Sequence, residues 1–407
     1  KIYAAWHGVE GILLEELIDA GGQDPAEISL LRKTPAAGVV GTCRYKLKEG
    51  QQEDFQRIID VFRAHDIGYF FYIGGNDSMD TAKKVADLAH SEDYDLTAVG
   101  VPKTIDNDIG DEEFTVIDHT PGYGSAARYW AYIVQNVNEE NRGMSVSEPV
   151  AVLQAMGRTS GYIPAAARLA DPDREMPLQL YLAEAGHNLE SLADNVNTEL
   201  LRSGRCIVIV SEGFDVGSLG ERHDGFGHIE YGASRATVAQ TVVNYLNDHG
   251  LKARGQATGQ VPGVLQRGTS LYASATDIEE AYQAGRKAVE IGIHDGSGYM
   301  ATILRDPEEG SAADSDSPRP SEGSYRPYYD KVPLEKVANS VRHLPKSWIS
   351  KDELDVTDDF IRYARPLIGS GNPDIALENG LQRFARFNGT CIEKKLPGYV
   401  PLRFREY

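Results

Sequence analysis

The sequence predicts an α/β protein in which strands and helices alternate and the sheets are mostly parallel. Short runs rich in β-branched and aromatic residues, each followed by glycine, proline or a polar turn, predict buried strands at 67–73, 96–101, 149–153 and 206–210. Helices are expected near 121–138, 159–170, 188–203, 231–249 and 276–292. Ser78 is expected to cap the helix that follows the first of these strands. Ligands of parallel sheets bind where the strands end, so the turns there are the places to look for function.

The composition restricts the class of protein. The 407 residues are enough for two or three domains. The 41 Lys and Arg against 61 Asp and Glu give a net charge of −20, which excludes a general affinity for nucleic acid or anionic lipid, because that affinity needs clustered basic charge. The scattered Cys43, Cys206 and Cys391 predict free thiols and a cytoplasmic protein. No apolar run approaches the ~20 residues of a membrane helix.

The first candidate motif is Gly74-Gly75-Asn76-Asp77-Ser78, between a predicted strand and a predicted helix. Glycines allow the backbone to approach a ligand, and the amides at a helix N-terminus favour an anion. A simple tight turn explains the glycine pair equally well, and the helix dipole stabilises a carboxylate in the first turn. In a phosphate cradle, however, Asp77 would repel one phosphate of a long polyphosphate ligand.

The second candidate motif, Pro102-Lys103-Thr104-Ile105-Asp106-Asn107-Asp108, follows the next strand. Carboxylates at positions i and i+2 of an extended segment point to the same side. One can accept a proton while the other helps to hold a divalent cation, which is the division of labour that phosphoryl transfer needs. Lys103 supplies a positive charge beside them. A network of Asx turns with an ion-paired lysine is the structural alternative.

Three further motifs carry basic or acidic residues beside glycine. Met156-Gly157-Arg158-Thr159-Ser160-Gly161-Tyr162 offers an arginine that can bind phosphate bidentately, although Thr159 or Ser160 could serve only as a helix cap. Glu212, in Ser-Glu-Gly, could accept sugar hydroxyls or simply be solvated. Gln266-Arg267-Gly268 adds a cation, with Lys252 and Arg254 upstream. None of these motifs is decisive alone.

Together and in this order, GGNDS, PKTIDND, MGR, SEG and QRG resemble the phosphofructokinase family. The likeness extends from about Gly8 to Arg365 and includes the run Gly-Thr-Cys-Arg at 41–44. At positions 77 and 103 the sequence resembles the pyrophosphate-dependent branch of the family. ATP-dependent members usually have a glycine in place of Asp77 and another small residue in place of Lys103. The resemblance implies two Rossmann-like three-layer α/β domains with the active site between them. A phosphoryl-donor domain is expected at 1–122 plus 262–306, and a fructose 6-phosphate domain at 123–261 plus 307–407.

The resemblance also implies a reaction: reversible, Mg²⁺-dependent transfer of a phosphoryl group from pyrophosphate to the 1-hydroxyl of fructose 6-phosphate, a step of glycolysis and gluconeogenesis. Asp106 would be the general base, and Asp77, Lys103 and Arg158 the other catalytic residues. Contacts to the sugar phosphate are implied for Thr104, Ile105, Asp106, Met156, Gly157, Arg158, Glu212, Arg254 and Arg267, with Arg254 reaching across a subunit interface. Contacts to pyrophosphate are implied for Gly74, Gly75, Asp77, Ser78, Lys103 and Arg44. Magnesium would bridge pyrophosphate oxygens, supported by Asn76 and Asp108.

Several positions depart from the family pattern. The family usually opens with a strand and a glycine-rich phosphate turn, and we expect that part of the donor site to lie outside the given sequence. Asn76 stands where aspartate is commoner, Val264 where histidine or tyrosine is commoner, and Pro149 about where ATP-dependent relatives have an arginine. Two alternatives stay open: an ATP-dependent phosphofructokinase, and a catalytically silent subunit that binds sugar phosphate. A homodimer or homotetramer is expected.

Overall fold

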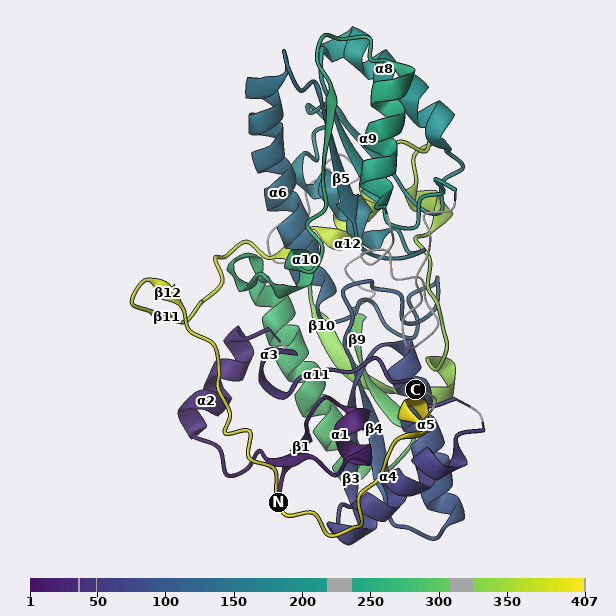
Figure 1. Cartoon of the computed structure of the whole chain (residues 1–407), viewed down its shortest axis with the longest axis vertical. Helices are drawn as coiled ribbons and strands as arrows, with labels where there is room; N and C mark the ends of the chain where they lie inside the picture. Colours follow the sequence, from purple (N-terminus) through teal and green to yellow (C-terminus); the bar gives the residue numbers. More distant parts are fainter. Residues whose placement is uncertain (36, 49, 218–235, 307–324, 406–407) are drawn as a thin grey trace.

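The computed structural model describes residues 1–35, 37–48, 50–217, 236–306 and 325–405. The chain forms two lobes, here called lower and upper after their positions in Figure 1. The lower lobe contains a four-stranded sheet of order β10-β9-β4-β3, and the upper lobe one of order β6-β7-β5-β8. Helix α6 (Tyr123–Met144) begins between the lobes and runs up one side of the upper one.

The lower sheet consists of β3 (Tyr69–Gly74), β4 (Thr97–Pro102), β9 (Tyr299–Arg305) and β10 (Pro327–Pro333). The first three strands run parallel, and β10 is antiparallel to β9. Alternate residues of β4 face opposite sides, as strand geometry requires. Ala98 belongs to the core beneath α4 (Gln52–Ala64) and α5 (Asn76–Ser91), whereas Val99 packs with Ala288 and Ile291 of α11 (Ala275–His294). The lobe therefore has three layers.

The upper sheet consists of β5 (Val150–Ala155), β6 (Leu178–Tyr181), β7 (Cys206–Ser211) and β8 (Ala257–Gln260), and all its strands run parallel. Val208 packs with α8 (Leu189–Ser203) and α9 (Val238–His249) on one face, and Ile207 packs with α6 on the other. Both faces are buried, which explains why β7 reads as a continuous apolar run. The expected pair of three-layer α/β domains is confirmed.

Shorter elements complete the fold. They are β1 (Tyr3–Ala5), α1 (Val9–Leu13), β2 (Leu17–Asp19), α2 (Pro25–Leu30), α3 (Ala37–Val40), α7 (Tyr162–Ala166), α10 (Leu265–Gly268), α12 (Asp358–Ala364), β11 (Leu377–Glu378) and β12 (Leu381–Gln382). Single 3₁₀ turns lie at Leu31–Lys33, Ala167–Ala170, Ser270–Tyr272, Leu334–Lys336, Lys346–Trp348, Pro366–Ile368 and Leu402–Phe404.

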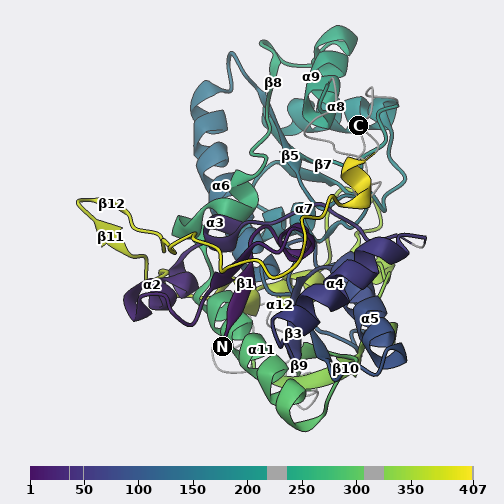
Figure 2. The ribbon, with the colours of Figure 1, turned by 60° about the horizontal axis from the view of Figure 1, so that its bottom comes forward.

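The C-terminal part of the chain divides differently from the expected domains. Phe360 and Leu367 do belong to the core of the upper lobe, but β10 pairs with β9 in the lower sheet. The last segment also returns to the lower lobe, where the amide of Ile392 donates to the carbonyl of Leu17 at 2.8 Å. Figures 1 and 2 show this yellow segment running back from the β11–β12 hairpin past the N-terminal elements. Assigning all of 307–407 to one sugar-phosphate domain is therefore wrong.

Local expectations are largely confirmed, with two exceptions in the helices. The four expected strands are present as β3, β4, β5 and β7. The expected helix at 159–170 is a short α7 continued by a 3₁₀ turn, and the start of the one at 231–249 lies outside the described residues. The three cysteines carry free thiols. In the described ranges, the helices are all too short or too polar to cross a bilayer.

Candidate active site

The turn between β3 and α5 places the GGNDS motif at the carboxyl end of the lower sheet. Helix α5 starts at Asn76 with Gly75 as its N-cap, so Ser78 lies inside the first turn and does not cap the helix. A Cβ on Gly74 would lie 2.0 Å from the Ser78 hydroxyl, which explains why glycine stands there. The side-chain amide of Asn76 donates to the carbonyl of Ser340 at 2.6 Å, which fixes its orientation. Asp77 lies in the first turn of α5 and lines a cavity that is described below.

The next turn brings Asp106 and Asp108 to a single cation. One guanidinium nitrogen of Arg158 lies 3.1 Å from a carboxylate oxygen of Asp106 and 3.1 Å from one of Asp108. The two carboxylates therefore converge, as the sequence predicts, but the backbone between them is not extended: Asn107 has φ +58°, in the left-handed region that asparagine tolerates. The expected reason is wrong, and a turn rather than strand alternation produces the arrangement.

The environment of Asp108 disfavours its charge. Burial, followed by the neighbouring Asp106 carboxylate, raises the pKa of Asp108 to about 6, although Arg158 opposes the shift. The carboxylate of Asp108 is held by the guanidinium of Arg158, which it shares with Asp106. Such a crowded pair of carboxylates is the arrangement expected where a second cation or a proton is to be accepted.

Glu212 shapes the turn that carries Arg158. One of its carboxylate oxygens accepts the backbone amides of Gly157 at 3.2 Å and Arg158 at 2.9 Å. A Cβ on Gly213 would lie 2.2 Å from the carbonyl of Arg158, so only glycine allows β7 to approach this turn. Burial raises the pKa of Glu212 to about 7. In this structure the Glu212 carboxylate therefore stabilises the turn that carries Arg158.

A cavity of about 360 Å³ opens between the lobes at these turns. Its lining comes from both lobes: Lys46, Asn76, Asp77, Asp108, Gly157, Arg158, Thr159, Ser160, Asn339 and Val341. Neither Thr159 nor Ser160 caps α7, whose N-cap is Gly161, and the Ser160 hydroxyl instead donates to the carbonyl of Arg342 at 2.8 Å. The predicted motifs after β3, β4 and β5 thus meet at one cavity.

The sequence interpretation missed three residues that line this cavity: Lys46, Asn339 and Val341. Lys46 is the charged one. Its ammonium forms a 2.5 Å ion pair with the Asp77 carboxylate. A signal was available, because Lys46 lies two residues after Arg44 of the Gly-Thr-Cys-Arg run. Its neighbours Tyr45 and Leu47 are buried in the core. In an extended segment alternate side chains point to opposite sides, so Arg44 and Lys46 point away from that core.

A second group of charged residues surrounds Lys103. Desolvation, followed by the positive charges of Arg267 and Arg44, lowers the pKa of Lys103, while Asp106 opposes the shift. These three side chains are therefore close enough for their charges to interact. Concentrated positive charge of this kind suits an anion that carries more than one negative charge.

The remaining predicted contacts are placed less directly. Thr104 accepts the amide of Asp106 on its hydroxyl at 3.1 Å, and the side chains of Ile105 and Met156 pack against the upper core. Arg254 lies apart from the cavity, in a groove shared with Val146, Ser147, Gly255 and Gln256. It precedes β8, at the amino end of the upper sheet, whereas the MGR turn follows β5 at the carboxyl end.

The comparisons with known proteins agree with this geometry. The Phosphofructokinase family profile matches residues 1–292. The pyrophosphate–fructose 6-phosphate 1-phosphotransferase of Halomonas elongata is 36% identical over 408 residues, which cover 98% of this chain and 91% of that relative. The chain belongs to the phosphofructokinase family. A second relative with the same name, from Methylococcus capsulatus, is 37% identical over 97% of this chain and 90% of its own length.

Solved structures extend the family likeness to the whole fold. The crystal structure of a pyrophosphate-dependent phosphofructokinase from Marinobacter aquaeolei matches with a TM-score of 0.83 and 34% identity, covering 99% of this chain and 91% of that one. The overall fold of this chain is therefore similar to that of a solved pyrophosphate-dependent phosphofructokinase.

A metal requirement can be tested against the donors that this phosphofructokinase presents. Among the described residues no group of three or more His, Cys, Asp or Glu side chains could hold a metal ion by itself. Asp77 and Asp108 nevertheless both line the cavity and present oxygen donors. This set fits Mg²⁺, which binds through one or two carboxylates together with the phosphates of a substrate. The side-chain oxygen of Asn76, the other expected metal-supporting residue, accepts the Asp77 amide at 2.9 Å.

Proposed function

We propose that this chain catalyses reversible phosphoryl transfer from pyrophosphate to the 1-hydroxyl of fructose 6-phosphate. The observation that carries the proposal is that Asp106 and Asp108 share the guanidinium of Arg158 beside a cavity. Asp108 and Arg158 line this cavity together with Asp77 and Lys46. Relatives of the pyrophosphate-dependent group, similar over nearly the whole chain, support the same reaction.

Asp106 is proposed as the general base for the sugar hydroxyl. Its carboxylate accepts two guanidinium N–H groups of Arg158, at 3.3 and 3.1 Å, which hold it in one orientation. A base needs to be fixed within hydrogen-bonding distance of the proton that it removes. Arg158 is also placed to neutralise charge on the transferred phosphoryl group, since phosphoryl transfer relies chiefly on positioning and charge stabilisation. The MGR turn, Glu212, Thr104 and Arg267 complete the proposed sugar-phosphate side.

Lys103, Arg44 and the turn at 74–78 are proposed to bind pyrophosphate, and Lys46 joins them. The ion pair between Lys46 and Asp77 affects how Asp77 can select the phosphoryl donor. The ammonium balances the Asp77 charge, so this carboxylate excludes a longer donor mainly by occupying space rather than by bare repulsion. The lysine remains positioned beside the donor, where it can also bind a phosphate oxygen.

Mg²⁺ is proposed as the cofactor, held by pyrophosphate together with Asp108 and Asp77. When bound, it would neutralise charge on the phosphates. The protein residues do the rest: they orient both substrates and hold the base. A cytoplasmic homodimer or homotetramer, in which Arg254 from a neighbouring subunit binds sugar phosphate, is proposed on family grounds alone.

The donor is tested by assaying fructose 1,6-bisphosphate formation by the purified full-length protein with pyrophosphate or ATP at equal magnesium. We expect a pyrophosphate kcat/KM at least 100-fold above that for ATP. A preference for ATP would refute the donor assignment and favour the ATP-dependent alternative. Absence of turnover with either donor would favour the silent sugar-binding subunit.

A further inference from the structure

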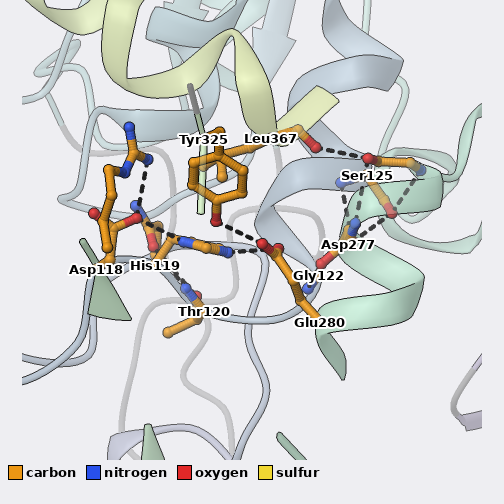
Figure 3. Close-up of polar contacts among 12 residues, drawn as sticks. Asp118, His119, Thr120, Gly122, Ser125, Asp277, Glu280, Tyr325 and Leu367 are labelled. Atoms are coloured by element: carbon orange, nitrogen blue, oxygen red, sulfur yellow. Dashed lines mark hydrogen bonds and ion pairs between the residues drawn. The ribbon is translucent and has the colours of Figure 1, made fainter. Parts of the chain in front are cut away.

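A cluster of buried charged side chains is centred on His119, between Asp118 and Glu280 (Figure 3). None of these three residues lines the cavity. The imidazole of His119 is held at both nitrogens: one lies 2.7 Å from a carboxylate oxygen of Asp118 and the other 2.8 Å from one of Glu280. His119 and Glu280 are almost completely buried, and they come from parts of the chain 161 residues apart. Two carboxylates on one imidazole leave it no freedom to rotate.

The charges of the cluster are balanced, and most of its polar atoms are hydrogen-bonded, although the Nε of Arg305 has no hydrogen-bond partner among the described residues. The guanidinium of Arg305 donates to Asp118 at 3.0 Å, and the hydroxyl of Tyr325 donates to Glu280 at 2.5 Å. Burial alone would lower the pKa of His119, but Glu280 and Asp118 raise it to about 9, so the ring is a cation at neutral pH. Two negative groups, Asp118 and Glu280, therefore meet two positive groups, His119 and Arg305.

The residue next to His119 holds the catalytic turn directly. The amide of Thr120 donates to the side-chain oxygen of Asn107 at 3.0 Å, and its hydroxyl donates to the carbonyl of Thr104 at 2.8 Å. Asn107 lies between Asp106 and Asp108, at the strained left-handed position of the turn. A displacement of His119 would therefore move Thr120, the next residue, whose two hydrogen bonds hold the turn that carries Asp106 and Asp108.

Helix α11 anchors the same segment at two points. Asp277 and Glu280 are three residues apart and lie on one face of the helix. Glu280 holds His119, while Asp277 accepts the amides of Gly122 at 2.7 Å and Ser125 at 3.0 Å (Figure 3). A helix packed on the lower sheet therefore fixes the segment 118–125 that runs behind the catalytic turn.

We propose that His119, clamped between Asp118 and Glu280, is a positioning residue that sets the geometry of Asp106 and Asp108 for phosphoryl transfer. It touches neither substrate, and its role is to fix the segment through which Thr120 holds the turn. This inference rests on the proposed function, since its readout is turnover. Misplacing reacting groups by about 1 Å can cost 100-fold in rate, so a modest shift of the segment is enough to be measured.

The test compares His119→Gln with His65→Gln in the full-length protein. His65 is a matched control: it is also buried and lies 2.7 Å from a buried carboxylate, Glu15, but it packs among the N- and C-terminal segments rather than behind the turn. We expect His119→Gln to lower kcat 10- to 100-fold with both KM values changed by less than about threefold. His65→Gln should lower the melting temperature and leave kcat within about twofold.

A second variant covers loss of folding. His119→Gln leaves Glu280 charged without its imidazolium partner, and His119→Gln/Glu280→Gln removes that charge and offers two amides that can bond to each other. The double variant should recover stability and part of kcat. If His119→Gln or the double variant folds and keeps wild-type kcat, His119 is only structural and the proposal fails. A wild-type protein without turnover would instead refute the proposed function.

Discussion

Asp106 and Asp118 are twelve residues apart in the chain and belong to two clusters of carboxylates. The pKa shifts in these two clusters are opposite in direction. At the cavity, Asp106 and Asp108 share the guanidinium of Arg158, and the pKa of Asp108 is raised to about 6. In the buried clamp, Asp118 is met by His119 and Arg305. Its pKa falls to about 2, because these two cations outweigh the effect of burial.

Asp108 shares one cation with a neighbouring carboxylate, whereas Asp118 is paired with two cations of its own. Buried charges stabilise a fold only when they are paired and hydrogen-bonded, and an underpaired carboxylate lowers the stability of the folded protein. A binding site needs a charged group such as Asp108 that can still bind a ligand. The residues that position the site, such as Asp118, need to be fully paired. The following predictions, from the largest expected effect to the smallest, test that contrast.

The Asp106→Asn variant should lose the most activity. Removing a general base typically lowers the rate about 10²–10⁴-fold, and the amide retains the size of the side chain. Steady-state formation of fructose 1,6-bisphosphate measures the effect. Asp87→Asn, on the exposed side of α5, is the control and should stay within about twofold of wild type. A near-normal kcat for Asp106→Asn would remove this residue from its proposed role.

Lys46→Met should weaken pyrophosphate binding. The variant removes the ammonium beside Asp77 and leaves that carboxylate facing the donor. We expect the KM for pyrophosphate to rise about 10-fold, equivalent to roughly 1.4 kcal/mol, with the KM for fructose 6-phosphate little changed. Lys48→Met is a control on the same segment, with an exposed side chain. Equal KM values in the two variants would show that Lys46 has no part in the donor site.

The two clusters should respond oppositely to pH. His119 binds its proton more tightly in the folded protein, so its stabilisation is complete below pH 6.5 and disappears as the pH rises through about 9. Free energies of unfolding between pH 6 and 10 measure this. The difference between wild type and His119→Gln should shrink over that range. A difference independent of pH would mean that the imidazolium charge contributes nothing.

Asp108→Asn should make the protein slightly more stable while it impairs catalysis. Because the folded-state pKa of Asp108 is raised, this group lowers stability as the pH rises from about 4 through about 6. At pH 7 the amide should raise the melting temperature by about 2–4 °C, which corresponds to roughly 1 kcal/mol in a large domain. The catalytic loss confirms that the variant reaches the site. A lower melting temperature would contradict the assignment of Asp108 as an underpaired group.

The sequence predicts the cavity better than it predicts the support behind it. Strand patterns and turn motifs are local, and parallel strands bring their carboxyl ends together, so Asp77, Asp106 and Arg158 could be placed from short segments. The clamp depends on Glu280, and the catalytic turn also depends on Arg342, whose buried guanidinium donates to the carbonyl and side-chain oxygens of Asn107. Contacts between residues 161 and 235 positions apart leave no local pattern to interpret.

Irregular segments account for the other differences. Lys46 lies in a stretch that is neither helix nor strand, so no periodic pattern marks it as part of the site. The C-terminal segment returns to the lower lobe through individual contacts, such as the Tyr399 hydroxyl with the buried Asp54 at 2.7 Å. Composition cannot show which lobe such a segment joins, and the predicted domain boundary failed there.

The most direct measurement is the reverse reaction. The purified full-length protein would be incubated with fructose 1,6-bisphosphate, phosphate and Mg²⁺, and pyrophosphate would be followed by ³¹P NMR. The proposed function predicts that pyrophosphate accumulates with wild type and not with Asp106→Asn. No pyrophosphate from wild type, together with ATP formation when ADP replaces phosphate, would contradict it.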